Sequence, residues 1–466
     1  MSIFNKQYLL TSCNLDIQGM QEIQVLRNRH LYVGKDLKVK TIAQDGNESV
    51  VLGNVFSGEI MGKSIEDDLK GKQESLREAA WHWTGRWLLF DDGELITDAC
   101  GLMAAFYYQD EKGWYISSSL AVLQKVLELK RIGKVNQTGL TWAIIPNTIV
   151  EGVRKLLPTQ KIIFKGNTID IFFDNWIKDQ RALETEQKCE KITTSLCNAI
   201  ANLHNETKAP IYLTLTGGKD CRLVFACVHK AKVPVHCFTF EHSNLPKCDR
   251  VIPKQIAEKY NQPYRFVRSK PFLQNLYDEY CDFCDYNSLG ADAEFYAKGV
   301  YHQLPQGAVM LKGGLFEAGQ TYSRSFMQNT LEGVKKGFES YYGPYLKNDF
   351  AKESWDEYCD YIQAYPIPWL DLRDRLYLEQ RCGAWVAAIE QSLDITGVTS
   401  IQVANSAEII STLLSATEEE RKNKAFSMAL IKYVEPSLLD FPINPLYLSD
   451  KIRIINNAIK KRLFRK

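Results

Sequence analysis

The first part of the chain, up to about residue 175, is a series of short apolar runs separated by turn residues. Turn signals such as Asp91-Asp92-Gly93 lie between these runs. Runs of four or five residues at this spacing are typical of strands joined by short connections, so the sequence predicts antiparallel sheets. The runs are residues 49–53, 87–90, 94–97, 104–108, 114–117 and 161–164.

Two stretches in this first part have helical character. Residues 64–83 are rich in charged residues and helix formers, and Ser64 with Asp67 three residues later predicts a capped start. Residues 117–129 open with hydroxyl side chains and continue with Leu and Val at helical spacing. We expect a helix in each stretch.

The pattern changes after a polar, charged stretch at residues 174–188. The next apolar residues recur at helical spacing and predict an amphipathic helix: Ile192, Leu196, Ile200 and Leu203. A chain of 466 residues is also longer than a single domain of average size. We therefore predict an N-terminal β-rich α+β domain at residues 1–180 and a second domain at residues 189–466.

The second part begins with a buried strand at residues 211–215, a glycine pair at Gly217-Gly218 and an apolar helix at residues 221–229. A further apolar run at residues 233–240 follows after a connection long enough to join parallel strands. Residues 375–390 and much of the chain to Leu439 have helical character. The expected fold is α/β, with a parallel sheet and a helical C-terminal part.

A strand, a glycine turn and a helix in succession bring backbone N–H groups and a positive helix end to bear on a phosphate. The commoner phosphate loop would need Gly at position 213 and Ser or Thr at position 220, where this chain has Leu213 and Asp220. An acidic residue here would repel a triphosphate unless a divalent cation lies between them, so Asp220 indicates Mg²⁺. An ordinary turn in an α/β sheet is the alternative.

The loop Thr216-Gly217-Gly218-Lys219-Asp220-Cys221 resembles the Ser-Gly-Gly-x-Asp-Ser pyrophosphate loop of the asparagine synthetase-like family. Earlier residues, in order, are similar to the glutamine amidotransferase half of that family: residues 85–93, 98–101, 107–108 and 117–120. The resemblance spans nearly the whole chain. It implies an amidotransferase-like domain followed by an adenine nucleotide α-hydrolase-like synthetase domain.

The chain departs from the family at its glutaminase nucleophile. That half uses a Cys exposed by loss of the initiator Met, whereas position 2 here is Ser2 and Cys13 is the first cysteine. A hydroxyl without strong activation is a much poorer nucleophile than a thiol. We expect a degenerate amidotransferase domain without glutaminase activity.

A second glycine-bearing strand end, at residues 309–319, resembles the family's Ser-Gly-x-Gly-x-Asp-Glu loop. Residue by residue, Glu317 takes the place of the metal-binding Asp, and Gly314 that of the Glu acting as acid or base. Residues 438–444 also lack the catalytic Lys that asparagine synthetases carry after this point. Metal binding is therefore expected, while the acid or base of amide formation is missing; a strand followed by a glycine turn is the alternative.

The resemblance implies attack of a carboxylate on ATP, giving an acyl-adenylate and pyrophosphate, followed by attack of an amine. Lys219 and Asp220 would be catalytic, and Asp220 and Glu317 would bind Mg²⁺. Asp249, an acid near a helix start, is equally well explained by a nucleotide or loop contact or by no function. The expected nucleotide-binding residues are Thr216, Gly217, Gly218, Cys221, Arg222, Thr239, Phe240, Asp249 and Gly313.

Composition limits the partners. A net charge of +1 gives no long-range attraction to nucleic acid. The start of the sequence lacks a signal-peptide pattern, and no apolar run approaches the roughly 18 residues of a transmembrane helix. With 12 cysteines, a cytoplasmic location with reduced thiols is expected. Cys281 and Cys284 are better explained as two thiols on a helix than as a zinc site.

Residues 451–466 contain seven basic residues and no acidic one. They predict either a solvated terminal helix or a peripheral contact with an anionic membrane. The function expected from the whole sequence is ATP-dependent amide-bond formation between a carboxylate and an amine acceptor. A non-catalytic nucleotide-binding or scaffold protein of the same fold is the alternative, indicated by Gly314 and by Cys221 where the family has Ser.

Overall fold

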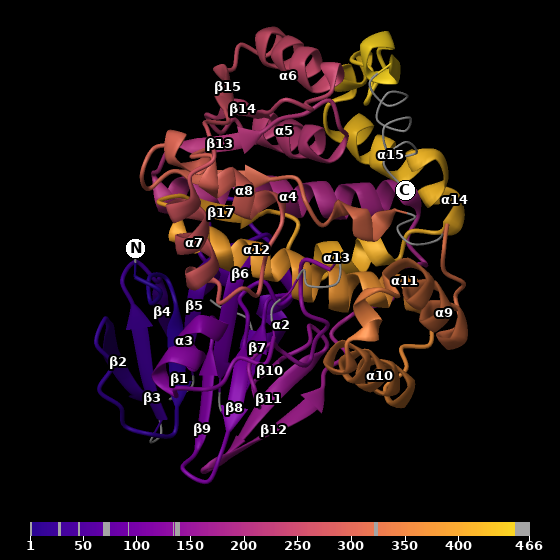
Figure 1. Ribbon diagram of the computed structural model, residues 1–466. Coiled ribbons are helices and arrows are strands. Elements are labelled where there is room, and N and C mark those ends of the chain that lie inside the picture. The colour runs from indigo at the N-terminus through magenta and orange to yellow at the C-terminus, as the bar shows by residue number, and fades with distance from the viewer. Residues whose placement is uncertain are drawn as a thin grey trace.

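The computed structural model describes residues 2–26, 29–44, 47–68, 75–91, 93–133, 135, 140–320 and 325–452. The described residues form two antiparallel six-stranded sheets and one parallel five-stranded sheet. Figure 1 shows strands β1 to β12 in the lower part of the view and β13 to β15 in the upper part. The fold is therefore mixed α/β, with both predicted kinds of sheet.

The first antiparallel sheet has the order β10-β8-β9-β1-β3-β2. Its strands are β1 (Tyr8–Thr11), β2 (Met20–Leu26), β3 (Arg29–Gly34), β8 (Phe106–Gln109), β9 (Trp114–Ser117) and β10 (Arg154–Lys155). The second sheet has the order β12-β11-β7-β6-β5-β4. Its strands are β4 (Val39–Gln44), β5 (Asn47–Ser57), β6 (Trp83–Asp91), β7 (Glu94–Thr97), β11 (Gln160–Lys165) and β12 (Thr168–Phe173).

The two antiparallel sheets share one apolar core, as in a β-sandwich. Leu10 of β1 and Trp114 of β9 belong to the same buried cluster as Leu88 and Phe90 of β6. All six predicted runs are strands, although the run at residues 104–108 becomes a strand only from Phe106. Six further strands were not predicted: β1, β2, β3, β4, β10 and β12.

The prediction of one helix over residues 64–83 was wrong. The structure has two short helices, α1 (Ile65–Asp68) and α2 (Leu76–Ala79), then a 3₁₀ turn at Ala80–His82. The predicted cap is present, because the Ser64 backbone N–H donates to Asp67 at 3.0 Å. Trp83 is fully buried in β6, so sheet packing ends the helical stretch before it. The other predicted helix is confirmed as α3 (Leu120–Val126).

The polar stretch at residues 174–188 leads directly into helix α4 (Thr185–Thr207). The four predicted apolar residues of α4 are at most 1% exposed, so its amphipathic face is confirmed. They share one buried cluster with Phe56 of β5 and with residues of the parallel sheet. One core thus extends across the predicted boundary between residues 180 and 189, and that boundary stays a prediction.

The parallel sheet has the order β15-β14-β13-β16-β17. Its strands are β13 (Ile211–Thr214), β14 (His236–Glu241), β15 (Tyr264–Arg268), β16 (Val309–Lys312) and β17 (Thr399–Gln402). Every neighbouring pair is parallel. From β13 the chain adds β14 and β15 on one side of the sheet, and then β16 and β17 on the other side. In sheets of this order ligands bind where the direction reverses, beside the carboxyl ends of the two central strands.

Helices cover the parallel sheet and make up most of the remaining chain, as predicted. Those that follow the first strands are α5 (Asp220–Lys230), α6 (Lys247–Lys259), α7 (Gln274–Phe283) and α8 (Ala291–Ala297). The C-terminal part contains α9 (Leu331–Tyr342), α10 (Asp349–Ala364), α11 (Leu372–Leu376), the π-helix η5 (Tyr377–Val386), α12 (Ala387–Ser392), α13 (Ala407–Leu414), α14 (Glu418–Arg421) and α15 (Ala425–Val434). Neither the π-helix nor strand β17 was predicted.

Cys281 lies on α7 and Cys284 directly follows it, and both thiols are buried. Within the ranges that the structure describes, no helix is long and apolar enough to cross a membrane. The basic stretch at residues 451–466 lies almost entirely outside the described residues, from residue 453 onward. Its predicted contact with a membrane surface therefore stays a prediction.

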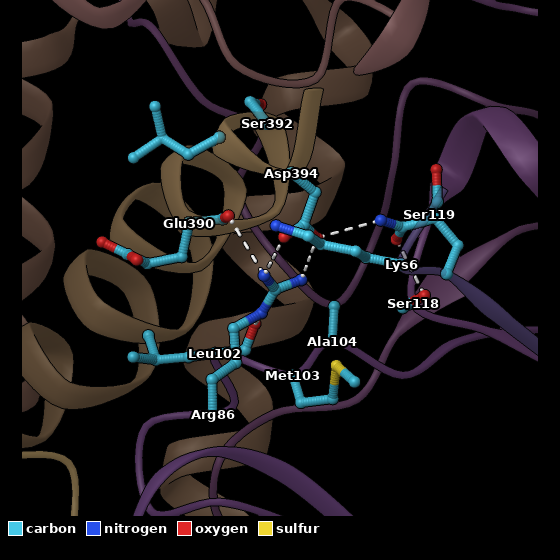
Figure 2. Close-up of polar contacts among 12 residues, drawn as sticks. Lys6, Arg86, Leu102, Met103, Ala104, Ser118, Ser119, Glu390, Ser392 and Asp394 are labelled. Atoms are coloured by element: carbon cyan, nitrogen blue, oxygen red, sulfur yellow. Dashed lines mark hydrogen bonds and ion pairs between the residues drawn. The ribbon is translucent and has the colours of Figure 1, made fainter. Parts of the chain in front are cut away.

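A buried ion pair joins the antiparallel part to the C-terminal helices. Figure 2 shows the Arg86 guanidinium, on β6, between the Asp394 carboxylate and the Glu390 carbonyl. Two bonds of 2.9 and 2.8 Å reach Asp394, which follows α12 in a 3₁₀ turn. Burial disfavours the charged guanidinium, yet the attraction of Asp394 leaves the pKa of Arg86 above its usual value. Gln7 also donates to Asp394, so three distant segments meet at this carboxylate.

We predict that Asp394→Ala lowers the free energy of unfolding by about 3–5 kcal/mol, because it leaves a buried guanidinium without its counter-charge. Urea denaturation followed by circular dichroism measures the change. Asp356→Ala is the control, since Asp356 pairs with Lys352 on the exposed face of α10. A loss no larger than that of the control would show that the Arg86–Asp394 pair does not hold the two parts together.

Candidate functional site

Two loops meet at the carboxyl ends of β13 and β16. The first joins β13 to α5, and the second follows β16. A Cβ atom on Gly313 would lie 2.6 Å from the backbone nitrogen of Cys221, so only glycine allows this approach. The structure therefore brings the two glycine-bearing motifs together at the point where the strand order reverses.

Hydrogen bonds within the first loop fix its shape. The Gly217 N–H donates to Asp249 Oδ1 at 2.7 Å, and the Gly218 N–H donates to Thr216 Oγ1 at 3.2 Å. The Thr216 N–H donates to the thiol sulfur of Cys221 at 3.2 Å. The two glycine N–H groups expected to face a phosphate are thus engaged by the protein. Of the alternatives left open for Asp249, the structure shows the loop contact.

Lys219, Asp220 and Gln320 form a closed polar group. Lys219 Nζ lies 3.2 Å from Asp220 Oδ2 and donates to Gln320 Oε1 at 2.8 Å. The Gln320 amide in turn donates to Asp220 Oδ1 at 3.2 Å. Gln320 lies just beyond the second motif, and nothing in its sequence context indicated this role.

Asp220 sits in an environment that disfavours its negative charge. Burial raises the pKa of Asp220 to about 6, with Glu317 adding to the rise and Lys219 opposing it. Gln320 links the two loops here, because its side-chain amide donates to Asp220 and its backbone N–H donates to the Glu317 carbonyl at 3.0 Å. Asp220 and Glu317 come from different loops, as the sequence predicted.

Tyr377 orients Glu317. Its hydroxyl donates to Glu317 Oε2 at 3.1 Å, and burial raises the pKa of Tyr377 so that the phenol stays protonated. Tyr377 is the first residue of the π-helix η5, a kind of helix often found at functional sites. Sequence reasoning missed it because it lies 60 residues from Glu317 and in no motif.

The Asp220–Glu317 pair fits a magnesium ion. Burial is the main cause of the raised pKa of Asp220 and the charge of Glu317 adds to it, so a bound cation would favour the ionised carboxylate. Mg²⁺ is commonly bound by one or two carboxylates together with substrate phosphates. Among the residues that the structure describes, no group of three or more His, Cys, Asp or Glu side chains could hold a metal. A site here would therefore need phosphate oxygens to complete it.

Arg222 is not placed as a nucleotide ligand. Its side chain is fully buried, and the guanidinium donates to the carbonyl oxygens of Gly217, Leu438, Phe441 and Pro442 at 2.6–3.2 Å. These bonds hold residues 438–442 against the first loop. The Arg222 side chain thus makes structural contacts, and a nucleotide contact of this residue stays a prediction. Cys221 likewise uses its thiol within the loop, toward Thr216.

Thr239 and Phe240 lie at the end of β14, the strand next to β13. The Thr239 hydroxyl donates to the Leu215 carbonyl at 2.6 Å and is 2% exposed. The Phe240 ring packs against Phe238 and Phe295, with centroids 5.1 and 5.5 Å away. Their side chains stabilise the strand end. A backbone contact of these residues with adenine stays a prediction.

The place of the missing acid or base at Gly314 is filled by Gln402. The Gly314 N–H donates to Gln402 Oε1 at 3.1 Å, and a Cβ on Gly314 would lie only 2.6 Å from that oxygen. The Gln402 amide donates to Glu390 at 2.8 Å, and Lys312 binds the same carboxylate at 2.9 Å. A larger residue at position 314 would displace this network.

No model of a known protein family matches this sequence, and neither does any curated protein. Solved structures that share some similarity include NMN synthetase from Francisella tularensis and glutamine-dependent NAD+ synthetase from Acinetobacter baumannii in complex with ADP. Each is 14% identical, with TM-scores of 0.20 and 0.21. The first match covers 31% of this chain and 59% of the neighbour, and the second covers 40% of this chain and 37% of the neighbour.

The glutamine phosphoribosylpyrophosphate amidotransferase from B. subtilis, complexed with ADP and GMP, covers more of the chain. It is 10% identical over 72% of this chain and 74% of that chain, with a TM-score of 0.22. Likenesses of this size carry no argument about function. The case for a nucleotide site rests on the sheet order and the two loops.

We predict that Asp220→Asn stabilises the protein at neutral pH and that the gain shrinks in acid. The pKa of Asp220 is raised from 3.8 to about 6. Below the unfolded pKa the carboxyl group is protonated in both states, so the buried charge does not destabilise the wild type. As the pH rises to about 6 and above, the group ionises in the folded protein and the free energy of unfolding falls. A shift of this size corresponds to at most about 3 kcal/mol. Urea denaturation with EDTA, from about pH 4.5 to pH 7.5, measures the difference; a difference independent of pH would contradict the burial of this charge.

Proposed function

We propose that the protein is an ATP-dependent ligase that forms amide bonds through an acyl-adenylate. The observation that carries this proposal is that the loop with Asp220 and the loop with Glu317 meet at the reversal point of a parallel sheet. Ligands of such sheets bind at this point. The resemblance of both loops to the asparagine synthetase-like family supports the same conclusion.

In this proposal a substrate carboxylate attacks the α-phosphorus of ATP, the bond to the β-phosphate breaks, and pyrophosphate leaves. An amine then attacks the acyl carbon, and AMP leaves as the amide forms. Mg²⁺, bound by Asp220 and Glu317, would offset the negative charge of the phosphates. Lys219 lies beside Asp220 and would stabilise the charge that develops on the leaving pyrophosphate.

The proposal divides the chain into a degenerate amidotransferase-like unit at residues 1–180 and a synthetase unit at residues 189–466. Ser2, where the family has its nucleophilic Cys, accepts a hydrogen bond from the Phe4 N–H at 3.3 Å. This contact stabilises a turn and does not make the hydroxyl more nucleophilic. The amide nitrogen would therefore come from free ammonia or from an amine substrate.

A second candidate function is a non-catalytic nucleotide-binding or scaffold protein of the same fold. The specific observation in its favour is that the N–H groups of Gly217 and Gly218 are engaged by Asp249 and Thr216. Phosphate binding through these groups would require both partners to move. The filled place at Gly314 points in the same direction.

We predict that the wild type binds ATP with Mg²⁺ and releases pyrophosphate in the presence of a suitable carboxylate. Asp220→Asn and Glu317→Gln should each lower pyrophosphate release at least about a hundredfold, because each removes a charge from the phosphate site. Asp356→Asn on the exposed face of α10 is the control. A coupled phosphate assay over a panel of carboxylates measures the rates.

Binding of ATP without pyrophosphate release over that panel would favour the non-catalytic function. Full activity of both variants would remove Asp220 and Glu317 from the site. Absence of ATP binding by the wild type would overturn the ligase and any nucleotide-binding function, and would leave only a scaffold of the same fold.

We predict that the purified protein releases no glutamate from glutamine above background, with or without ATP, because Ser2 has a hydroxyl in place of the thiol that the family's glutaminase half requires. A glutamate dehydrogenase assay measures the product. Ser2→Ala is the matched variant and should behave as the wild type does. Glutamate release that disappears in Ser2→Ala would instead show an active glutaminase unit.

A further inference from the structure

The segment of residues 438–444 lies against the glycine pair of the first loop. Arg222 binds three of its carbonyl oxygens, and the Asn444 N–H donates to the Gly217 carbonyl at 3.0 Å. The segment is thus attached to the loop at both of its ends. Asn444 is the residue that reaches Gly217 and Gly218.

The Asn444 side chain faces the two glycines. A Cβ atom on Gly217 would lie 3.5 Å from Asn444 Oδ1, and one on Gly218 would lie 3.9 Å from Oδ1 and 4.0 Å from Nδ2. Because residues 217 and 218 are glycines, no side chain of the loop lies between its backbone and the side-chain amide of Asn444. Asn444 is also exposed, so a ligand on the loop can reach it from solvent.

The backbone of Asn444 restricts which residues can stand there. Its φ of +47° lies in the left-handed region, which Gly, Asn and Asp adopt most readily. Among these three, only Asn brings N–H donors at neutral pH.

We propose that Asn444 is a ligand-binding residue of this site and that its amide Nδ2 donates to a phosphate oxygen of the bound nucleotide. The inference rests on the proposed function only as far as nucleotide binding at the loop. It adds a donor from the C-terminal segment to a loop whose own glycine N–H groups are engaged by Asp249 and Thr216. Arg222 is then a positioning residue, because it fixes the segment that carries Asn444.

Two variants of the full-length chain separate the amide from the backbone. Asn444→Gly and Asn444→Asp both tolerate a positive φ, so the bond from residue 444 to the Gly217 carbonyl is kept. Isothermal titration with ATP and Mg²⁺, and separately with inorganic pyrophosphate and Mg²⁺, measures affinity. The matched control is Asn261→Gly, because Asn261 is likewise exposed and has a φ of +52° but lies at the end of α6.

We expect Asn444→Gly to weaken both ligands about tenfold or more, the effect of one hydrogen bond to a charged group. Asn444→Asp should weaken them further, because a carboxylate repels phosphate. The difference between the two variants separates the added charge from the loss of the donor, because only Asn444→Asp brings a negative charge. Asn261→Gly should bind as the wild type does.

Wild-type affinity in both Asn444 variants, with binding by the wild type intact, would overturn the role of Asn444 alone. A loss shared equally by both variants would also overturn it, because a purely structural role predicts that pattern. A wild type that binds neither ATP nor pyrophosphate would overturn the proposed function and this inference with it.

Discussion

The buried pair of Arg86 and Asp394 determines how the antiparallel sheets sit on the candidate site. Two charges removed from water stabilise a fold only when their geometry satisfies both, and this pair is bidentate. The same helical stretch carries Glu390, which binds Lys312 and Gln402 on its other side. Because Gln402 reaches the Gly314 N–H, the loop after β16 is positioned by a helix that β6 holds in place.

Local signals were enough to predict much of the fold. The strand, glycine pair and helix around Gly217 are each encoded by neighbouring residues, so β13 and α5 were predicted nearly to their ends. Strand β17 was not, because Thr399–Gln402 contains one large apolar residue and forms by pairing with β16. The prediction of one helix over residues 64–83 was wrong for a related reason. Trp83 is buried in the core beneath β6, and this packing outweighs the helix propensity of the preceding residues.

The candidate site also contains residues that local motifs predict and residues that only the folded chain brings together. Asp220 and Glu317 could be predicted because each lies in a short motif. Tyr377 and Asn444 reach the loops from segments distant in sequence, and Gln320 lies one residue beyond the second motif. Only the folded chain shows their contacts. Arg222 also lies in a motif, but only the folded chain shows that carbonyl oxygens of the protein satisfy its buried guanidinium.

The charge balance of the loops decides what they can bind. Asp249 holds the Gly217 N–H, Asp220 and Glu317 raise the local negative charge, and Lys219 already pairs with Asp220. The proposed donor from Asn444 adds no charge, so it does not change this balance. We therefore propose that nucleotide binding at this loop requires a divalent cation, which would separate the phosphates from the carboxylates before any chemistry follows.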